Sequence, residues 1–335
     1  MKKSYLIIVF LIVVYILVFF FSFTIGQYPI SFSDSIKVLF SRIFPIERVW
    51  DETFDVVIFQ ARLPRIISAM LVGGALSIGG ASFQGIFYNP LVEPYILGVS
   101  SGAGFGAAIA ILLGGNFITV QVTSFLMGLL SMILTLWIGS SRRNKSTITL
   151  VLSGFIVGSL FSSFISFIKF VADPYTKLPS IVFWLMGSFA SVSYRALAIS
   201  APIIIVGSLV LILLRWKLNI LAMGDNEAKT LGENPVRLRL SVIFLTTLIT
   251  ASSVSISGII GWVGLVVPHI ARMLFGSDHR KLIPASLFLG SGYLLIIDNL
   301  SRTITTSELP IGILTALIGA PIFAFLLRKE RSGWA

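Results

Sequence analysis

The sequence has no cysteine and only two histidines among its 335 residues. The absence of cysteine excludes disulfide bonds, zinc–thiolate sites and iron–sulfur clusters, all of which need thiolate ligands. Two histidines also argue against a metal centre built on imidazole groups. We therefore expect no metal site in this chain.

Charged residues are scarce as well. They make up 12% of the sequence, whereas soluble globular chains carry roughly 25%. Hydrophobic residues make up 56%, and the mean hydropathy is +0.97. The formal net charge is +11, but the basic residues stand in short clusters between apolar runs, which is typical of membrane topology and not of nucleic-acid binding. We expect a membrane protein that binds a lipid bilayer and no nucleic acid.

The apolar runs also lack the side chains of a catalyst. They contain no paired carboxylates, no cluster of metal ligands and no nucleophile with a neighbouring base. The phosphate-binding pattern G-x-x-x-x-G-K-[ST] is absent from the whole chain. We expect no catalytic residue here and no enzyme, and any ATP must be bound by another subunit.

What the sequence does contain is a series of apolar runs separated by short polar segments, which predicts an all-α polytopic membrane protein with about ten transmembrane helices. The whole chain, 1–335, is expected to form a single transmembrane domain. A smaller apolar piece at 181–187 predicts a partial or re-entrant helix, and the mixed segment 26–61 predicts an external loop with short interfacial helices. The predicted spans are 5–25, 63–86, 95–113, 117–140, 147–171, 196–214, 240–260, 261–275, 282–299 and 311–327.

The distribution of Lys and Arg predicts the orientation of these spans. With the N-terminus inside, the inner segments hold 16 of the 25 basic residues and the outer segments hold nine. Because cytoplasmic loops carry the excess of positive charge, we expect both termini in the cytoplasm, as an even number of spans requires.

Glycine is abundant, with 29 residues, and several lie four apart within the predicted spans. Small residues at this spacing let helix backbones approach each other closely in lipid, so the pattern predicts a tightly packed helix bundle.

The longest polar segment on the predicted inner side runs from about 215 to 239. Asp225 can cap a short helix whose first turn holds Glu227, and Gly232 and Pro235 can end it. A short amphipathic helix beneath the membrane suits the docking of a cytosolic partner, although a solvated connector would carry the same residues.

The ordered motifs resemble the FecCD-type permeases of ATP-binding-cassette (ABC) importers, which import iron–siderophore complexes, haem and vitamin B12. The resemblance covers essentially the whole chain. It is carried by Arg62-Leu63-Pro64-Arg65, Gly73, Gly80, Gln84, Asn89-Pro90-Leu91, Pro94, Gly98, Ser101-Gly102-Ala103, Ser257-Gly258, Gly261, Val263-Gly264-Leu265, Pro268-His269, Arg272, Gly276, Asp278-His279-Arg280, Pro284, Asp298, Arg302, Glu308-Leu309-Pro310, Gly312, Gly319-Ala320-Pro321 and Phe323.

The resemblance implies roles for specific residues. It implies a cytoplasmic gate at Asn89 and Leu91 and a second gate loop at Ser146 and Thr147, with Gln84 among the polar side chains along the translocation path. It implies that external arginines receive acidic residues of a substrate-binding protein: Arg62, Arg65 and Arg302. It also implies that the inner polar segment couples to the ATPase through Gly224, Asp225, Glu227, Ala228, Leu231 and Gly232.

The resemblance further implies a set of partners. Permeases of this kind form homodimers in the inner membrane with the translocation path between the subunits, two ATPase subunits below and a substrate-binding protein above. No cofactor is expected in this chain, since ATP and Mg would be bound by the ATPase. The cargo stays open at this point: ferric siderophore is the leading expectation, haem, cobalamin and an oxyanion such as molybdate are alternatives, and a secondary carrier that works without an ATPase is the rival reading.

Overall fold

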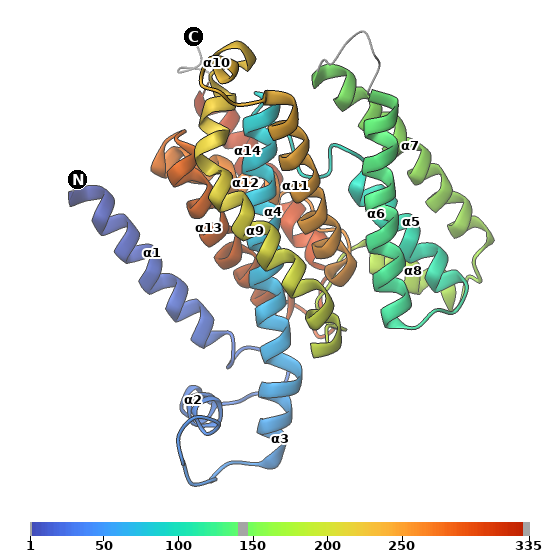
Figure 1. The fold of residues 1–335 in the computed structure, drawn as a ribbon. Coiled ribbons are helices and arrows are strands. Elements are labelled where there is room, and N and C mark those ends of the chain that lie inside the picture. The colour runs from blue at the N-terminus through green and yellow to red at the C-terminus, as the bar shows by residue number, and fades with distance from the viewer. Residues whose placement is uncertain (1, 140–146, 331–335) are drawn as a thin grey trace.

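The computed structural model describes residues 2–139 and 147–330, and the described chain is built from helices and loops (Figure 1). Every predicted span corresponds to one of its ten longer helices, so the predicted all-α architecture is confirmed. These helices are α1 (Lys2–Phe21), α4 (Leu63–Phe87), α5 (Val99–Leu112), α6 (Phe117–Gly139), α7 (Thr147–Val171), α9 (Tyr194–Ala222), α11 (Pro235–Ser257), α12 (Val263–Phe275), α13 (His279–Ser301) and α14 (Ile311–Glu330).

Six helical segments within the described residues are long and apolar enough to cross a membrane on their own. They contain α4, α6, α7, α9, α11 and α13. The apolar parts of α1, α5, α12 and α14 are shorter, between 10 and 17 residues. Short helices complete the described chain: α2 (Phe32–Phe40), α3 (Glu52–Asp55), α8 (Lys177–Leu185) and α10 (Asp225–Thr230), with a π-helical stretch η1 (Val56–Arg62).

Most boundaries differ from the prediction by a few residues, and three of the differences change how a segment is described. The second span does not begin at 63, because α3, η1 and α4 form one continuous helical run from Glu52 to Phe87. The partial helix expected at 181–187 is instead the nine-residue α8, Lys177–Leu185. Helix α9 extends to Ala222, eight residues beyond the predicted end at 214, so the inner polar loop is shorter than the expected 215–239.

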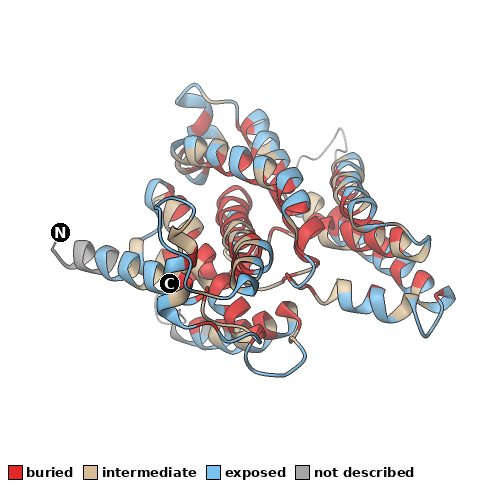
Figure 2. Cartoon of the chain, turned by 90° about the horizontal axis from the view of Figure 1, so that it is seen from below, coloured by how far each residue is buried: buried red, intermediate tan, exposed pale blue. Residues whose placement is uncertain are grey.

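Helix α4 forms the centre of the bundle. It packs against α9, α11, α12 and α13, and nearly all of its residues from Val72 to Phe87 are buried (Figures 1 and 2). Helices α5, α6, α7 and α8 form a second group, which meets the first through α11. Helix α1 lies at the periphery, and most of its described side chains are exposed or half-buried.

The central helix can be surrounded so closely because glycines replace side chains at its contacts. A Cβ atom added at Gly80 would lie 1.8 Å from the carbonyl oxygen of Gly264 in α12, and one added at Gly73 would lie 2.2 Å from the carbonyl oxygen of Gly290 in α13. Glycines four apart do the same in α5, where a Cβ atom at Gly102 would lie 2.5 Å from the carbonyl oxygen of Met127 in α6 and one at Gly106 would lie 2.3 Å from that of Thr123. Such close backbone approach stabilises helix packing in lipid.

We expect Gly80→Ala to destabilise the protein by about 1–3 kcal/mol, because the added methyl group must push two packed backbones apart. The matched control is Gly158→Ala, where the nearest atom would lie 3.7 Å away and the change should only gain helix propensity, up to about 1 kcal/mol. Thermal unfolding of both variants in detergent checks the difference. Equal unfolding temperatures would contradict the assigned α4–α12 contact.

Candidate functional site

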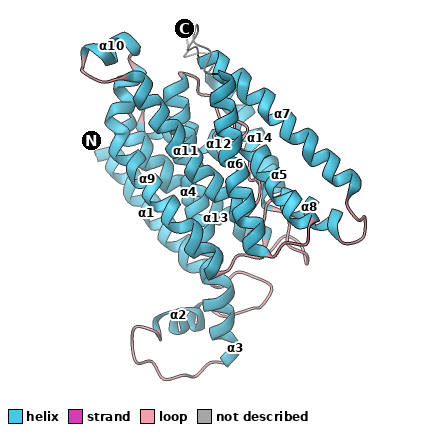
Figure 3. Ribbon diagram, turned by 45° about the vertical axis from the view of Figure 1, so that its right-hand side comes forward, coloured by secondary structure: helices cyan, strands magenta, loops and turns pink. Residues whose placement is uncertain are grey.

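The loop between α9 and α11 contains the short helix α10 at one end of the bundle (Figures 1 and 3). Asp225 is not the cap that its sequence position predicts: Gly224 is the N-cap residue, at φ +121°, and Asp225 is the first helical residue. Asp225 instead forms an ion pair of 2.7 Å with Arg239 in α11. That pair ties the start of α10 to the bundle.

The end of α10 follows the prediction. Gly232 has φ +81°, its N–H donates to the carbonyl of Lys229 at 3.0 Å, and the N–H of Glu233 donates to the carbonyl of Ala228 at 2.9 Å. This pair of bonds is the Schellman arrangement, which needs a left-handed residue that glycine adopts without strain. Helix α10 is therefore held at both ends, by the Asp225–Arg239 ion pair at its start and by these hydrogen bonds at its end.

The surface of α10 combines a buried anchor with an exposed apolar tip. Ala228 is fully buried, whereas the side chains of Glu227 and Leu231 are exposed. Leu231 is 58% exposed, and Met223, just before the helix, is 63% exposed. Two exposed apolar side chains on a polar loop give α10 a surface that another protein can cover.

The loop that follows α4 holds Asn89 and Leu91. Helix α4 ends at Phe87, and Tyr88 takes a left-handed conformation with φ +52°. The side chain of Asn89 then accepts a hydrogen bond of 2.9 Å from the N–H of Leu91, so the amide holds a tight turn, and both residues are exposed. Both expected gate residues thus lie on a fixed turn at the surface.

This turn contacts the last turn of α9 and the first residue of α10, a link that sequence reasoning missed. The hydroxyl of Tyr88 donates to the carbonyl of Leu221 at 2.6 Å and lies 3.5 Å from a carboxylate oxygen of Asp225. Displacement of α10 would therefore act directly on the Asn89 turn. No sequence signal pointed to Tyr88, because its partners are more than 130 positions away.

The expected second gate loop is only partly described. Ser146 lies outside the described residues, and Thr147 begins helix α7. The gate role of these two residues stays a prediction.

Gln84 is buried within the bundle. It lies on α4 with 3% of its surface exposed, and its Oε1 atom accepts a hydrogen bond of 2.8 Å from Arg272 of α12. Gln84 is therefore enclosed by its own chain, and its expected place along a path stays a prediction. In the fold, Gln84 connects the central helix to α12.

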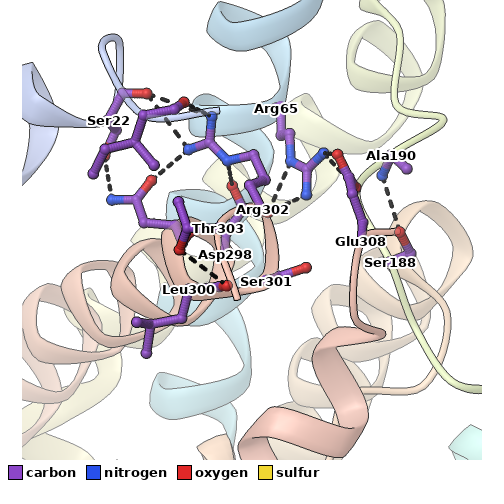
Figure 4. Close-up of polar contacts among 12 residues, drawn as sticks. Ser22, Arg65, Ser188, Ala190, Asp298, Leu300, Ser301, Arg302, Thr303 and Glu308 are labelled. Carbon is purple, nitrogen blue, oxygen red and sulfur yellow. Dashed lines mark hydrogen bonds and ion pairs between the residues drawn. The ribbon is translucent and has the colours of Figure 1, made fainter. Parts of the chain in front are cut away.

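The three arginines expected to dock a binding protein are buried, with exposures of 4%, 7% and 5% for Arg62, Arg65 and Arg302. Arg65 makes ion pairs of 2.8 Å with Asp298 and with Glu308, and Arg302 pairs with Asp298 at 3.2 Å (Figure 4). Because these guanidinium groups are committed inside the chain, the structure corrects the expectation that they receive a partner's carboxylates directly.

Arg62 and Arg302 also hold the end of α1. Arg62 donates to the backbone carbonyls of Phe23 and Tyr28, and Arg302 donates to the carbonyl of Ile25 at 2.9 Å. The carbonyl groups that follow a helix end need hydrogen-bond donors, and the two guanidinium groups supply them. We call the set Arg62, Arg65, Asp298, Arg302 and Glu308 the arginine cluster.

Helix α7 carries an exposed polar face that sequence reasoning did not single out. Ser159, Ser162, Ser163 and Ser166 are all exposed, and Ser163 and Ser166 donate to carbonyls one turn back, at 3.0 Å each. A lipid-facing surface favours purely apolar side chains. A row of hydroxyls on a spanning helix therefore indicates an aqueous or protein-covered face.

A cavity of about 560 Å³ opens along this face between α5 and α7. Ser101, Phe155, Ser159 and Ser162 are part of its lining, and the hydroxyls of Ser101 and Ser162 lie 3.3 Å apart. No charged side chain of the described chain lines it. The cavity can hold a bulky solute with neutral polar groups.

A metal centre has no evident place in the described chain. No group of three or more His, Asp or Glu side chains in residues 2–139 and 147–330 could hold a metal ion.

Comparisons with known proteins match nearly the full length of the chain. The family described as the FecCD transport family matches residues 12–329. The molybdate import system permease protein of Haemophilus influenzae is 41% identical over 93% of this chain and 92% of its own. A Helicobacter pylori permease named for iron chelatin transport is 40% identical over 83% of this chain and 84% of its own.

A solved structure has the same fold. It is an inward-facing conformation assigned to the metal-chelate type of ABC transporter, with 40% sequence identity and a TM-score of 0.86. The match covers 96% of this chain and 99% of that one.

Proposed function

Because the chain belongs to the FecCD transport family of multi-pass ABC importer permeases, we propose that it translocates a metal chelate, with a ferric siderophore as its cargo. The observation that carries this choice is the α5–α7 cavity of about 560 Å³, whose described lining offers serine hydroxyls, the aromatic rings of Tyr95 and Phe155, and no charged group. A large chelate presents mainly C–H surface and oxygen atoms, which such a lining can contact.

The chain acts with partners in this proposal. Two copies place their α7 faces on either side of a shared path in the inner membrane, with both termini in the cytoplasm. Two ATPase subunits bind ATP and Mg and engage α10, and a substrate-binding protein delivers the cargo from the other side. The chain itself holds no cofactor.

The mechanism follows from the Tyr88 link. Closure of the ATPases moves α10, and the hydrogen bond from Tyr88 to Leu221 passes that movement to the turn of Asn89 and Leu91. The turn then opens or closes the inner end of the path. The permease provides the path and its gate, and ATP hydrolysis takes place in the ATPase subunits.

Molybdate is the second candidate cargo, because the relative from Haemophilus influenzae, 41% identical, is named for its import. The uncharged lining argues against it: a small dianion is held best by cationic groups or converging N–H donors. Haem and cobalamin are large chelates too and would fit the same lining, so an uptake experiment has to distinguish them from a ferric siderophore.

The test is uptake into liposomes that contain the permease with its ATPase, supplied with its binding protein. We expect ATP-dependent uptake of a radiolabelled ferric siderophore, of the hydroxamate or catecholate class, and none of labelled molybdate, haem or cobalamin. ATP-dependent uptake of molybdate alone would overturn the chelate assignment. Uptake driven by an ion gradient without the ATPase would overturn the importer mechanism.

A further inference from the structure

Helix α1 is attached to the rest of the protein mainly near its C-terminal end. Tyr15 stacks on Phe288 of α13 with ring centroids 4.4 Å apart, and Asn299 donates to the hydroxyl of Ser22 at 2.8 Å. Towards the N-terminus, α1 diverges from the bundle (Figure 1). The space between α1 and the bundle on this side is lined by side chains of α1, α12 and α13.

Two adjoining cavities occupy this space. One of about 560 Å³ lies between α1 and α13, the other of about 210 Å³ lies further along α1 towards its C-terminal end, and both are lined by Leu11, Phe288 and Leu289. We call them together the α1 groove. The larger cavity falls within the range of about 300–1,000 Å³ typical of sites for small ligands. The groove can therefore hold a molecule and not merely a water.

The walls of the α1 groove are apolar. Val14 and Val18 of α1 line the smaller cavity together with Val267 and Ile270 of α12. An unfilled apolar gap loses dispersion contacts on both walls, and in a bilayer the molecules at hand to fill it are hydrocarbon chains. The smaller cavity of the groove is suited to an acyl chain.

One end of the groove is basic. Arg280 and Lys281, in the first turn of α13, line the larger cavity, and both side chains are exposed. Arg280 also lies over the ring of Trp216, 4.8 Å from its centroid. A tryptophan beside basic side chains at the end of spanning helices is typical of the level of lipid headgroups.

Asp278 lies beside these cations, but hydrogen-bond donors of Arg280 and Lys281 stay free to bind a ligand. Asp278 lies 3.2 Å from Nε of Arg280 and also accepts from Asn219 at 2.6 Å, and these donors lower the pKa of its carboxyl to about 2. None of the described hydrogen bonds of Arg280 uses its terminal Nη atoms, and Lys281 has no carboxylate partner among the described residues. A phosphate can therefore be bound by the guanidinium fork and the ammonium group together.

We propose that the α1 groove binds an anionic phospholipid, with an acyl chain between α1 and α12–α13 and the phosphate against Arg280 and Lys281. The charge at one end and the apolar walls beyond it match the two parts of such a lipid, and basic pockets between helices at the inner surface favour acidic headgroups. The binding holds whatever the cargo of the permease is, because the groove lies apart from the α5–α7 cavity.

The test is native mass spectrometry of the purified full chain titrated with phosphatidylglycerol and, separately, with phosphatidylcholine of the same acyl chains. We expect phosphatidylglycerol to bind about tenfold or more tightly, from the two basic side chains at the headgroup. The double variant Arg280→Gln/Lys281→Gln should reduce this preference to below about twofold. The matched control Lys229→Gln/Arg237→Gln removes two exposed basic groups elsewhere on the inner side and should keep the full preference.

A second variant tests the acyl part independently of charge. Leu11→Trp fills the groove from the peripheral helix α1 and should weaken the binding of both lipids, while the unfolding temperature stays near that of the wild type. Equal affinity of the wild type for the two lipids would overturn the proposal. So would a full preference retained by the Arg280→Gln/Lys281→Gln variant, or lipid binding that Leu11→Trp leaves unchanged.

Discussion

Asp298→Asn is expected to cost about 3–5 kcal/mol of stability, the largest effect of any single substitution that we predict. Asp298 is fully buried and pairs with both Arg65 at 2.8 Å and Arg302 at 3.2 Å. Asparagine keeps the shape of the side chain but removes its charge, so two buried guanidinium groups lose the anion that they share. Thermal unfolding in detergent and the yield of monodisperse protein measure the loss.

The same change at an exposed aspartate is the control. Asp34 in α2 lies 3.9 Å from Lys37, and its side chain is 37% exposed. Exposed pairs contribute about 0–1 kcal/mol, so Asp34→Asn should leave the unfolding temperature nearly unchanged. If Asp298→Asn were equally mild, the arginine cluster would not hold this end of the bundle together.

A double variant separates lost pairing from lost packing. In Asp298→Asn, Arg65 keeps its ion pair with Glu308, whereas Arg302 loses its carboxylate partner. Adding Arg302→Gln removes that unpaired cation, so the double variant should cost less than the sum of the two single changes, by about 0.5–3 kcal/mol. If the stability losses of the two single changes simply added, Asp298 and Arg302 would not interact, and the ion pair of 3.2 Å would contribute nothing to stability.

The helices were predictable because they depend on local patterns. Apolar runs of 18 residues or more are set by the thickness of the bilayer, and glycines at a spacing of four are set by helix periodicity. The end of α10 was predictable for the same reason, since Gly232 answers a local backbone requirement. The continuous run from Glu52 to Phe87 was not, because a π-helical stretch has no reliable sequence signal.

The candidate site was less predictable because its partners are distant in sequence. Arg65 meets Asp298 across 233 positions, and Gln84 meets Arg272 across 188. From sequence alone an arginine near a span end looks exposed, and a glutamine within a span looks like part of a path. Only the fold shows that the arginine lies beside carboxylates and that the glutamine lies beside a guanidinium group. The serine face of α7 was missed because single hydroxyls within an apolar run carry little signal.

Leu231→Glu is expected to abolish association with the ATPase and to lower ATP-dependent uptake by about tenfold or more. Leu231 closes α10 with 58% of its surface exposed, while Ala228 anchors the same helix in the bundle. The new carboxylate would lose its hydration at the contact with the ATPase without gaining a partner, and this makes association less favourable. Co-purification of the ATPase and uptake by liposomes measure the two effects.

The control must carry the same substitution where no ATPase can reach it. Leu113 follows α5 in a short connection to α6, at the end of the bundle opposite α10 in the predicted topology, and it is 79% exposed. Leu113→Glu should therefore leave ATPase binding intact, and because Leu231 is exposed, both variants should unfold near the wild-type temperature. Loss of association in both variants would indicate a general defect of the permease. If Leu231→Glu retained both association and uptake, α10 would be a solvated connector, and the ATPase would have to engage another inner loop.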